Sequence, residues 1–160
     1  MSLIGVTHKG IEIAAWVVKG DPSVFPIDEV IESGETIESW SVHQSYRTEL
    51  MEAGQKCLLW MSGASGAFVA EGLLTGEVEL HEADVDEWLD KEKARNSHLY
   101  AMLELRVLEE PIEREFLRQH PLLSQIELMR MPQGSNPSIL SPPELTAIEQ
   151  VLGREVGDKN

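Results

Sequence analysis

Two apolar runs surround a short loop of small residues in the stretch LLWMSGASGAFVAEGLLTGEV, residues 58–78. Each run has the length and the apolar content of a buried strand. The loop SGASG, residues 62–66, contains two glycines, which adopt positive φ angles without steric cost. The stretch therefore predicts a β-hairpin. Trp60, where the first run meets the loop, is either a core residue of that hairpin or the wall of a pocket.

The length and composition are typical of one domain with a substantial core: 160 residues, of which 42% are hydrophobic. We expect this domain to occupy residues 4–153 and to be followed by a flexible tail, residues 154–160. No apolar run approaches the ~18 residues of a membrane span, and no secretory leader is apparent, so we expect a cytoplasmic protein without a membrane partner. The single cysteine, Cys57, is predicted to be a buried small hydrophobe.

The net charge of −15 argues against one broad class of function. Proteins that hold nucleic acid by its phosphates have basic surfaces, because counterion release supplies most of their sequence-independent affinity. Here 28 acidic residues stand against 13 basic ones. Non-specific binding to a duplex is therefore not expected, although a local basic lip around a pocket that reads one base is compatible with this composition.

The segments before the hairpin alternate between strands and short helices. An apolar, β-branched run at residues 11–20 predicts a buried strand, and residues 36–42 predict another. Between them, a helix is expected from Pro26 to a stop at Gly34. Residues 45–54 predict a further helix, with the side chains of three of its residues on one face: Tyr46, Leu50 and Met51.

The segments after the hairpin continue this pattern. The charged stretch at residues 84–95 predicts either a helix or a surface excursion, and residues 122–130 are ambiguous. Alternating apolar residues at 98–111 predict a long strand, which a short helix follows at 112–120. Residues 141–153 predict the clearest helix, with a serine N-cap and a glutamate three residues later. The sequence thus indicates an α+β domain around a curled mixed sheet or small barrel.

Sequence signatures of catalysis are mostly missing. The SGASG loop is neither a nucleophile elbow nor a phosphate-binding loop. The five histidines are scattered, so no metal and no cofactor is expected. What stands out is a set of aromatic and amide side chains near expected strand ends. An aromatic platform and matched hydrogen-bonding groups are what recognition of an unpaired base requires.

The order of motifs resembles the EVE domain family, a branch of the PUA-like superfamily that also contains ASCH and YTH domains. Four segments carry the resemblance: AWVVKGDPSVFPIDEVIESG (15–34), SWSVHQSYRTELMEAGQ (39–55), CLLWMSGASGAFVAEGLLTGEV (57–78) and MPQGSNPSILSPPELTAI (131–148). The match covers nearly the whole chain in the family's order, and it is weakest at residues 81–95. It implies a PUA-like mixed β-barrel with short peripheral helices and a pocket for a nucleobase.

The resemblance also implies which side chains form that pocket. One side is expected to contain Trp40, His43, Gln44 and Arg47. Trp60 and Ser62 are expected opposite them, with the segment from Gln133 through Ser135 to Asn136 at the rim. In this interpretation Trp60 or Trp40 stacks on the base, and Arg47 or Lys19 meets a flanking phosphate.

Three functions are compatible with these observations. The leading hypothesis is a non-enzymatic module that recognises a modified, flipped or single-stranded nucleobase in DNA or RNA. An alternative is an enzyme acting on a small nucleoside-like substrate, with His43 or Glu71 as its acid or base. A third is an acidic protein-interaction domain, which complete burial of Trp16 and Trp40 would favour. The sequence does not indicate the oligomeric state.

Overall fold

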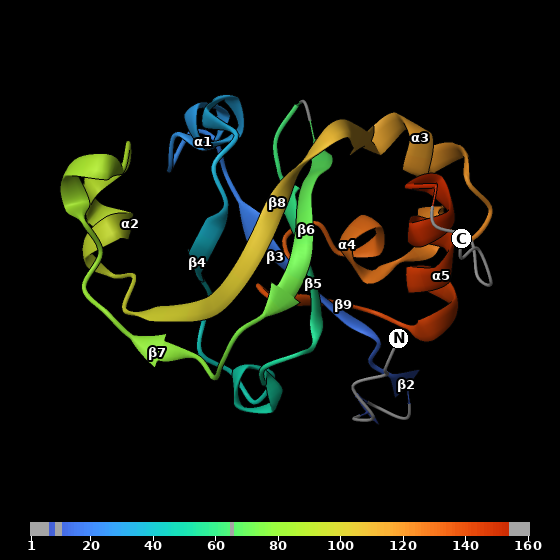
Figure 1. Ribbon diagram of the computed structural model, residues 1–160, viewed down its shortest axis with the longest axis horizontal. Helices are drawn as coiled ribbons and strands as arrows, with labels where there is room; N and C mark the ends of the chain where they lie inside the picture. The colour runs from blue at the N-terminus through green and yellow to red at the C-terminus, as the bar shows by residue number, and fades with distance from the viewer. Residues whose placement is uncertain (1–6, 9–10, 65, 154–160) are drawn as a thin grey trace.

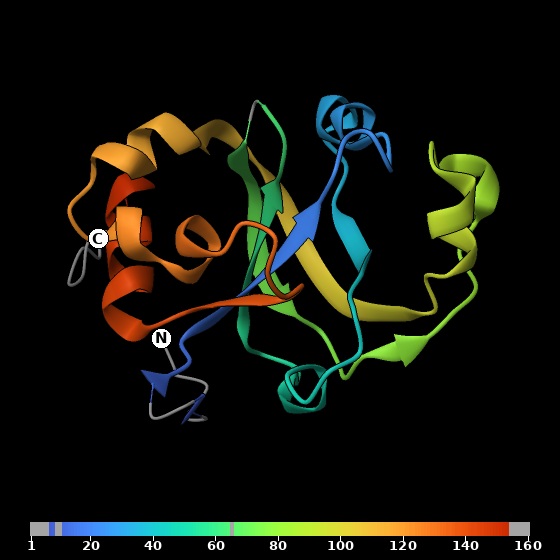
Figure 2. The ribbon, with the colours of Figure 1, turned by 180° about the vertical axis from the view of Figure 1, so that it is seen from behind.

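A computed structural model describes residues 7–8, 11–64 and 66–153 of the chain. The expected flexible tail at 154–160, the first residues of the expected domain and Ser65 of the hairpin loop lie outside the described residues. Figure 1 shows a curled sheet with the C-terminal helices gathered at one side and a separate helical excursion at the other. The view from behind in Figure 2 shows the same two groups on opposite sides of the sheet.

The sheet has seven strands, and its hydrogen-bonded order is β4-β8-β6-β5-β3-β9, with β7 paired to β8. Only the β3–β5 pair is parallel. The strands are β3 (Ala15–Gly20), β4 (Ile37–Ser41), β5 (Lys56–Met61), β6 (Ala67–Leu74), β7 (Glu79–Leu80), β8 (Leu99–Glu113) and β9 (Ser138–Leu140). The α+β class and the predicted hairpin, formed by β5 and β6, are confirmed.

The predicted strand at 11–20 is divided into two. Its first part is β2 (Ile11–Glu12), which pairs with β1 (Thr7–His8) in a separate two-stranded ladder, and its second part is β3. The division leaves residues 13 and 14 outside strands, yet Ile13 and Ala14 are fully buried. Burial alone therefore does not mark the ends of a strand here.

In the described residues, five short α-helices and three 3-10 turns accompany the strands, and the last helix follows the last strand. The helices are α1 (Ile27–Ser33), α2 (Lys91–Arg95), α3 (Arg114–Gln119), α4 (Glu127–Arg130) and α5 (Pro142–Val151). The 3-10 turns are η1 (Thr48–Leu50), η2 (Val85–Glu87) and η3 (Leu123–Gln125). The predicted capping box of α5 is present, because Ser141 and Glu144 bond to each other's backbone N–H groups.

The prediction of a helix at 45–54 is wrong. Only the single 3-10 turn η1 forms there, and Tyr46 is 51% exposed whereas Met51 is buried. Local hydrogen bonds explain the difference: the Ser45 carbonyl accepts from the Thr48 hydroxyl, and the Ser45 side chain accepts from the Arg47 N–H. Serine and threonine side chains that bond to nearby backbone favour a turn over a continuous helix.

Two hydrophobic cores lie on the two faces of the sheet. Strand β5 contributes to both: Cys57 and Leu59 pack inside the curled sheet, whereas Leu58 and Trp60 pack against the C-terminal helices. This alternation follows from the two-residue period of a strand. Since β5 is buried on both faces, its sequence is continuously apolar rather than alternating.

Candidate functional site

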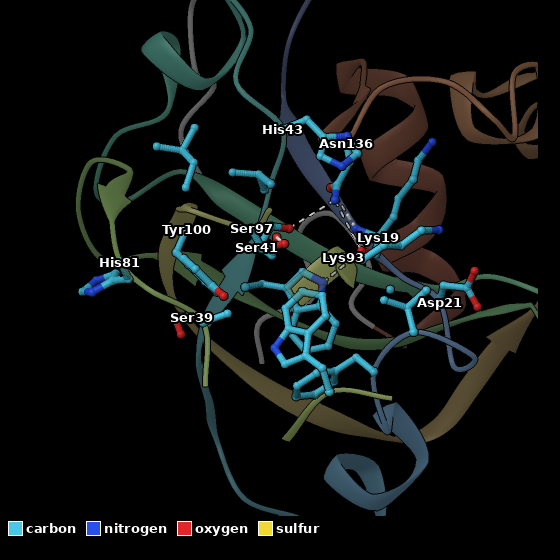
Figure 3. A pocket seen from close by; sticks show the side chains of 18 of the residues that line it. Lys19, Asp21, Ser39, Ser41, His43, His81, Lys93, Ser97, Tyr100 and Asn136 are labelled. Atoms are coloured by element: carbon cyan, nitrogen blue, oxygen red, sulfur yellow. Dashed lines mark hydrogen bonds between the residues drawn. The ribbon is translucent and has the colours of Figure 1, made fainter. Parts of the chain in front are cut away.

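A pocket of about 1170 Å³ opens beside the ends of β3 and β4. Segments far apart in the sequence line it: the end of β3 and the turn after it, β4 and the residues that follow, Ser62 of the hairpin loop, residues 80–100, and the loop before β9. Figure 3 shows Tyr100 and Ser39 on one side of this pocket, with Lys19 and Asp21 on the other. Its volume is above the roughly 300–1,000 Å³ typical of small-molecule sites, so it accommodates more than one aromatic ring.

Asn136 holds together the two ends of the sheet where the pocket opens. Its side-chain oxygen accepts a hydrogen bond from the Lys19 backbone N–H at 3.0 Å, and its amide nitrogen donates to the carbonyl oxygens of Ser41 at 3.1 Å and Lys19 at 3.4 Å. Its own carbonyl accepts from the His43 N–H at 2.9 Å. The terminal strands β4 and β9 are not paired in the described sheet. The Asn136 contacts, visible in Figure 3, bridge the gap that strand pairing would fill in a closed barrel.

Trp40 lies against this junction and is 8% exposed. Its indole N–H donates to the Lys19 carbonyl at 2.9 Å, which fixes the ring beside β3. A Cβ at Gly20 would lie 2.6 Å from the Trp40 ring, so the close approach of ring and strand requires glycine there. Phe25 contacts Trp40 edge-on, with ring centroids 5.5 Å apart.

Lys19 places an ammonium group in an unusual environment. Its Nζ is buried and has no hydrogen-bond partner among the described residues. Burial lowers the pKa of Lys19; the Glu127 carboxylate acts in the opposite direction, and Arg47 adds to the lowering. A buried ammonium without an acceptor is energetically unfavourable, so an oxygen atom of a ligand would be stabilised at this position.

The structure brings seven of the ten predicted site residues to this one pocket: Lys19, Trp40, His43, Gln44, Ser62, Gln133 and Asn136. Ser62 bonds through its hydroxyl to the Gly20 carbonyl at 3.0 Å, which holds the hairpin loop against the pocket. Ser135 is exposed in the same loop as Gln133 but is not among the lining residues.

Arg47 does not line the pocket, contrary to its expected place in the pocket wall. It is 4% exposed and forms a two-bonded ion pair with Glu127, with distances of 2.9 and 2.7 Å. Its guanidinium also donates to the Pro137 carbonyl at 3.0 Å. Glu127 in turn accepts from the Ser138 hydroxyl and the Ile139 N–H. This network ties η1 and α4 to β9 and leaves Arg47 inaccessible.

Trp60 also lies outside the pocket, contrary to the expectation that it stacks on a base. It is 2% exposed in the core between the sheet and the C-terminal helices. Phe68 contacts it edge-on at 5.1 Å, and the Arg114 guanidinium lies over its ring at 5.5 Å. Because Trp60 alternates with Leu59 along β5, it faces the helices and not the interior of the curled sheet.

Three aromatic residues that sequence reasoning missed do line the pocket: Phe25, Trp88 and Tyr100. Trp88 contacts Phe25 edge-on at 5.5 Å, so Trp40, Phe25 and Trp88 form a continuous aromatic row. A signal for Trp88 was present in the sequence, since a lone tryptophan in the charged run at 84–95 has to cover apolar surface elsewhere.

The enzyme alternative named His43 or Glu71 as its acid or base, and of these two only His43 lines this pocket. Glu71 is buried on β6, bonded to Lys56 at 2.7 Å, and lines a different pocket from His43. Of the two tryptophans whose complete burial would favour an interaction domain, Trp16 is fully buried, but Trp40 contributes to the pocket wall. In the described part of the chain, no group of three or more potential ligands is placed to hold a metal ion. No helix formed by those residues has the length and apolar content to cross a membrane.

The curled mixed sheet, its short peripheral helices and the pocket at the β3–β4 junction define an α+β protein of the PUA-like class. Within this class, the chain belongs to the EVE domain family, whose pattern matches residues 14–150. The family predicted from four sequence motifs is thereby confirmed.

Solved structures with the same fold come from bacteria and from humans. Rpa0253 from Rhodopseudomonas palustris, solved by NMR, has a TM-score of 0.62 and 19% identity, covering 92% of this chain and 99% of that one. Human THYN1 in complex with 5-methylcytosine-containing DNA has a TM-score of 0.60 and 11% identity, covering 89% and 99%. ASCH from Zymomonas mobilis has a TM-score of 0.52 and 9% identity, covering 86% and 95%. At these identities the likeness shows the fold alone. Comparison with curated proteins gave no match.

Proposed function

We propose that this chain is a non-enzymatic module that binds a modified nucleobase of DNA or RNA in the pocket beside Trp40. The proposal rests on the observation that segments far apart in the sequence come together at one pocket. The turn after β3, the residues after β4, the hairpin loop and the loop before β9 are separated by tens of residues, yet all line one pocket. These are the segments that carry the family motifs, and each contributes a side chain suited to a base.

The chemistry of the lining supports this proposal. The aromatic row formed by Trp40, Phe25 and Trp88 supplies apolar surface, and stacking on an aromatic side chain contributes roughly 1–3 kcal/mol per base. Gln44 and Gln133 are exposed at the pocket, and their amides make no hydrogen bond to any described residue. Such amides match the donors and acceptors of a base edge. The buried Nζ of Lys19 is the group we propose for a ligand oxygen, whether of a carbonyl or a phosphate.

The family relationship supports the same proposal. Human THYN1, which shares the fold, was solved with DNA that contains 5-methylcytosine. Taking a base out of a duplex costs a few kcal/mol, so a modified, damaged or single-stranded base is the favoured ligand. The cytoplasmic location expected from the sequence stays a prediction.

The experiment that tests the proposal is calorimetric titration with a single strand that carries one 5-methylcytosine and with the same strand unmodified. We expect the wild-type chain to prefer the modified strand. The Lys19→Met substitution removes one charged hydrogen bond and should weaken binding roughly 10- to 100-fold. Equal affinity for the two strands, with no effect of Lys19→Met, would contradict the proposal.

A matched pair of phenylalanine variants locates the binding site. Phe25→Leu shortens the aromatic row in the pocket and should weaken binding by up to about tenfold. Phe116→Leu makes the same change at an exposed position on α3, which lines a different pocket, and should leave affinity unchanged. Equal losses in the two variants would place the ligand elsewhere.

A further inference from the structure

The excursion between β7 and β8, residues 81–98, forms one wall of the pocket; we call it the outer wall. It contains η2 and α2, and Figure 1 shows α2 standing away from the rest of the fold. Two backbone hydrogen bonds hold it to the turn after β3, because the N–H groups of Leu89 and Asp90 both donate to the Val24 carbonyl. The Trp88–Phe25 contact adds an aromatic anchor. The outer wall is therefore built into the pocket.

The mouth of the pocket is acidic, and the outer wall supplies half of its carboxylates. Six carboxylate residues line the pocket, all of them exposed: Asp21, Glu35, Glu38, Glu82, Asp84 and Glu87. Two lysines oppose them. One is Lys19, whose Nζ is buried, and the other is Lys93, whose charge acts on Asp21. Exposed carboxylates are ionised at neutral pH, so the mouth carries a net negative charge.

Glu87 of the outer wall also acts on a side chain that lines the pocket. Burial, and to a lesser extent the Glu87 carboxylate, raise the pKa of Tyr100 on β8. A base bound beside Trp40 as part of a strand would carry a phosphate on each side of its sugar. Those phosphates would lie at a mouth lined by like charges, where repulsion lowers affinity.

Uncharged hydroxyl groups also line the pocket, on the face of β4 opposite to Trp40. Ser41 and Ser97 are hydrogen-bonded to each other through their hydroxyl groups at 3.0 Å, across β4 and the outer wall. Ser39 is exposed on β4 in the same pocket, and Tyr100 faces it from β8 (Figure 3). A volume of about 1170 Å³ accommodates both the base and the sugar.

Building on the function proposed above, we infer that the preferred ligand is a modified base in the form of an uncharged nucleoside, not a nucleotide within a phosphodiester strand. The aromatic row receives the base, and the acidic mouth disfavours flanking phosphates. The net charge of −15, which is unexpected for a reader of nucleic acid strands, agrees with this ligand class.

The test compares three probes by calorimetry: 5-methyl-2′-deoxycytidine, its 5′-monophosphate and a short single strand that contains it. Each is titrated at about 0.1 M and about 1 M salt, between which the Debye length falls from about 10 Å to about 3 Å. We expect the nucleoside to bind most tightly, with an affinity that salt hardly changes. The strand should bind more weakly, and its affinity should rise with salt as the repulsion is screened.

A triple substitution on the outer wall, Glu82→Gln, Asp84→Asn and Glu87→Gln, tests whether its negative charge causes the weaker binding of the strand. It should strengthen strand binding about five- to tenfold at low salt, with a much smaller effect on binding of the uncharged nucleoside. Its matched control is Glu109→Gln, Glu110→Gln and Glu113→Gln, which removes the same charge from exposed residues of the other pocket and should change neither affinity.

The outcomes separate this inference from the function on which it rests. A strand that binds more tightly than the nucleoside, with an affinity that falls steeply as salt rises, would overturn the inference and leave the proposed function standing. If neither the nucleoside nor the strand binds better than its unmodified counterpart, the proposed function fails, and the inference fails with it.

Discussion

Asn136 is hydrogen-bonded to Lys19 across 117 positions of sequence, and this contact joins the loop before β9 to the end of β3. The same side chain reaches Ser41 at the end of β4. The Asn136 amide and the Trp40 indole therefore both hold the ends of β3 and β4 together at this point, and the pocket opens beside them. Asn136, assigned from sequence to the pocket rim, also has a structural role that determines the shape of the site.

Replacement of Asn136 by alanine should destabilise the protein by about 2–3 kcal/mol, because the Lys19 N–H and the Ser41 carbonyl lose their partner. Urea denaturation measures this change. Ser135→Ala, at the exposed neighbouring position, is the control and should stay within about 0.5 kcal/mol of wild type. A loss no larger for Asn136→Ala than for Ser135→Ala would show that the amide does not hold the sheet ends.

The Arg47–Glu127 ion pair should be a stability determinant and not a ligand contact. Arg47→Met leaves a largely buried carboxylate without its cation and should cost about 3 kcal/mol. The exposed pair Arg118–Glu115 provides the comparison, since Arg118→Met should cost less than about 1 kcal/mol. The double variant Arg47→Met/Glu127→Leu should recover part of the loss. Equal effects at the two pairs would contradict the buried role of Arg47.

Glu127 also predicts a pH dependence of stability. Burial opposes its ionisation, but hydrogen bonds from Arg47 and Ser138 outweigh burial and lower its pKa to about 2, from 4.5 for the unperturbed group. Because the folded-state pKa is the lower one, its contribution is fully present above about pH 4.5 and is lost as the pH falls toward about 2.

The wild type should therefore be more stable than Glu127→Gln by about 2–3 kcal/mol at pH 7, and this difference should shrink as the pH falls below about 4.5. Urea denaturation of both proteins over that range measures it. The exposed Glu115→Gln variant should show no comparable trend. A difference between wild type and Glu127→Gln that is constant from pH 7 to pH 3 would contradict the assignment.

Cys57 should not react with thiol reagents in the folded protein. It is fully buried, as the sequence predicted, and burial raises the pKa of its thiol to about 12. Labelling with a chromogenic disulfide should be slow in buffer and complete in denaturant. Rapid labelling of the native protein would show that the interior of the curled sheet opens far more readily than its packing implies.

Most of the strands and the helices α1, α3 and α5 were predictable because their signals are local, whereas β9 was not expected. The hairpin around residues 62–66, the long β8 strand and the capping box of α5 each depend on residues close in sequence. The motif order, which also identified the family, selected seven residues that line one pocket. Alternation, caps and motifs can be recognised in a sequence without knowing which other element each helix or strand packs against.

The errors at Trp60 and Arg47 arose from long-range packing. Alternation along β5 shows that Trp60 and Leu59 face opposite ways, but it does not show which face the C-terminal helices cover. Arg47 is buried because Glu127, 80 positions later, provides a carboxylate on α4. Trp88 was missed because its contact with Phe25 depends on the outer wall folding back onto the turn after β3.

A modified base bound in the pocket should lie beside Trp40 and Trp88 and not beside Trp60. The four indole N–H signals of the ¹⁵N-labelled protein, assigned with tryptophan-to-phenylalanine variants, report its position. On addition of 5-methyl-2′-deoxycytidine, we expect shifts for the signals of Trp40 and Trp88 and none for those of Trp16 and Trp60. A shift of the Trp60 signal with those of Trp40 and Trp88 unchanged would contradict this expectation.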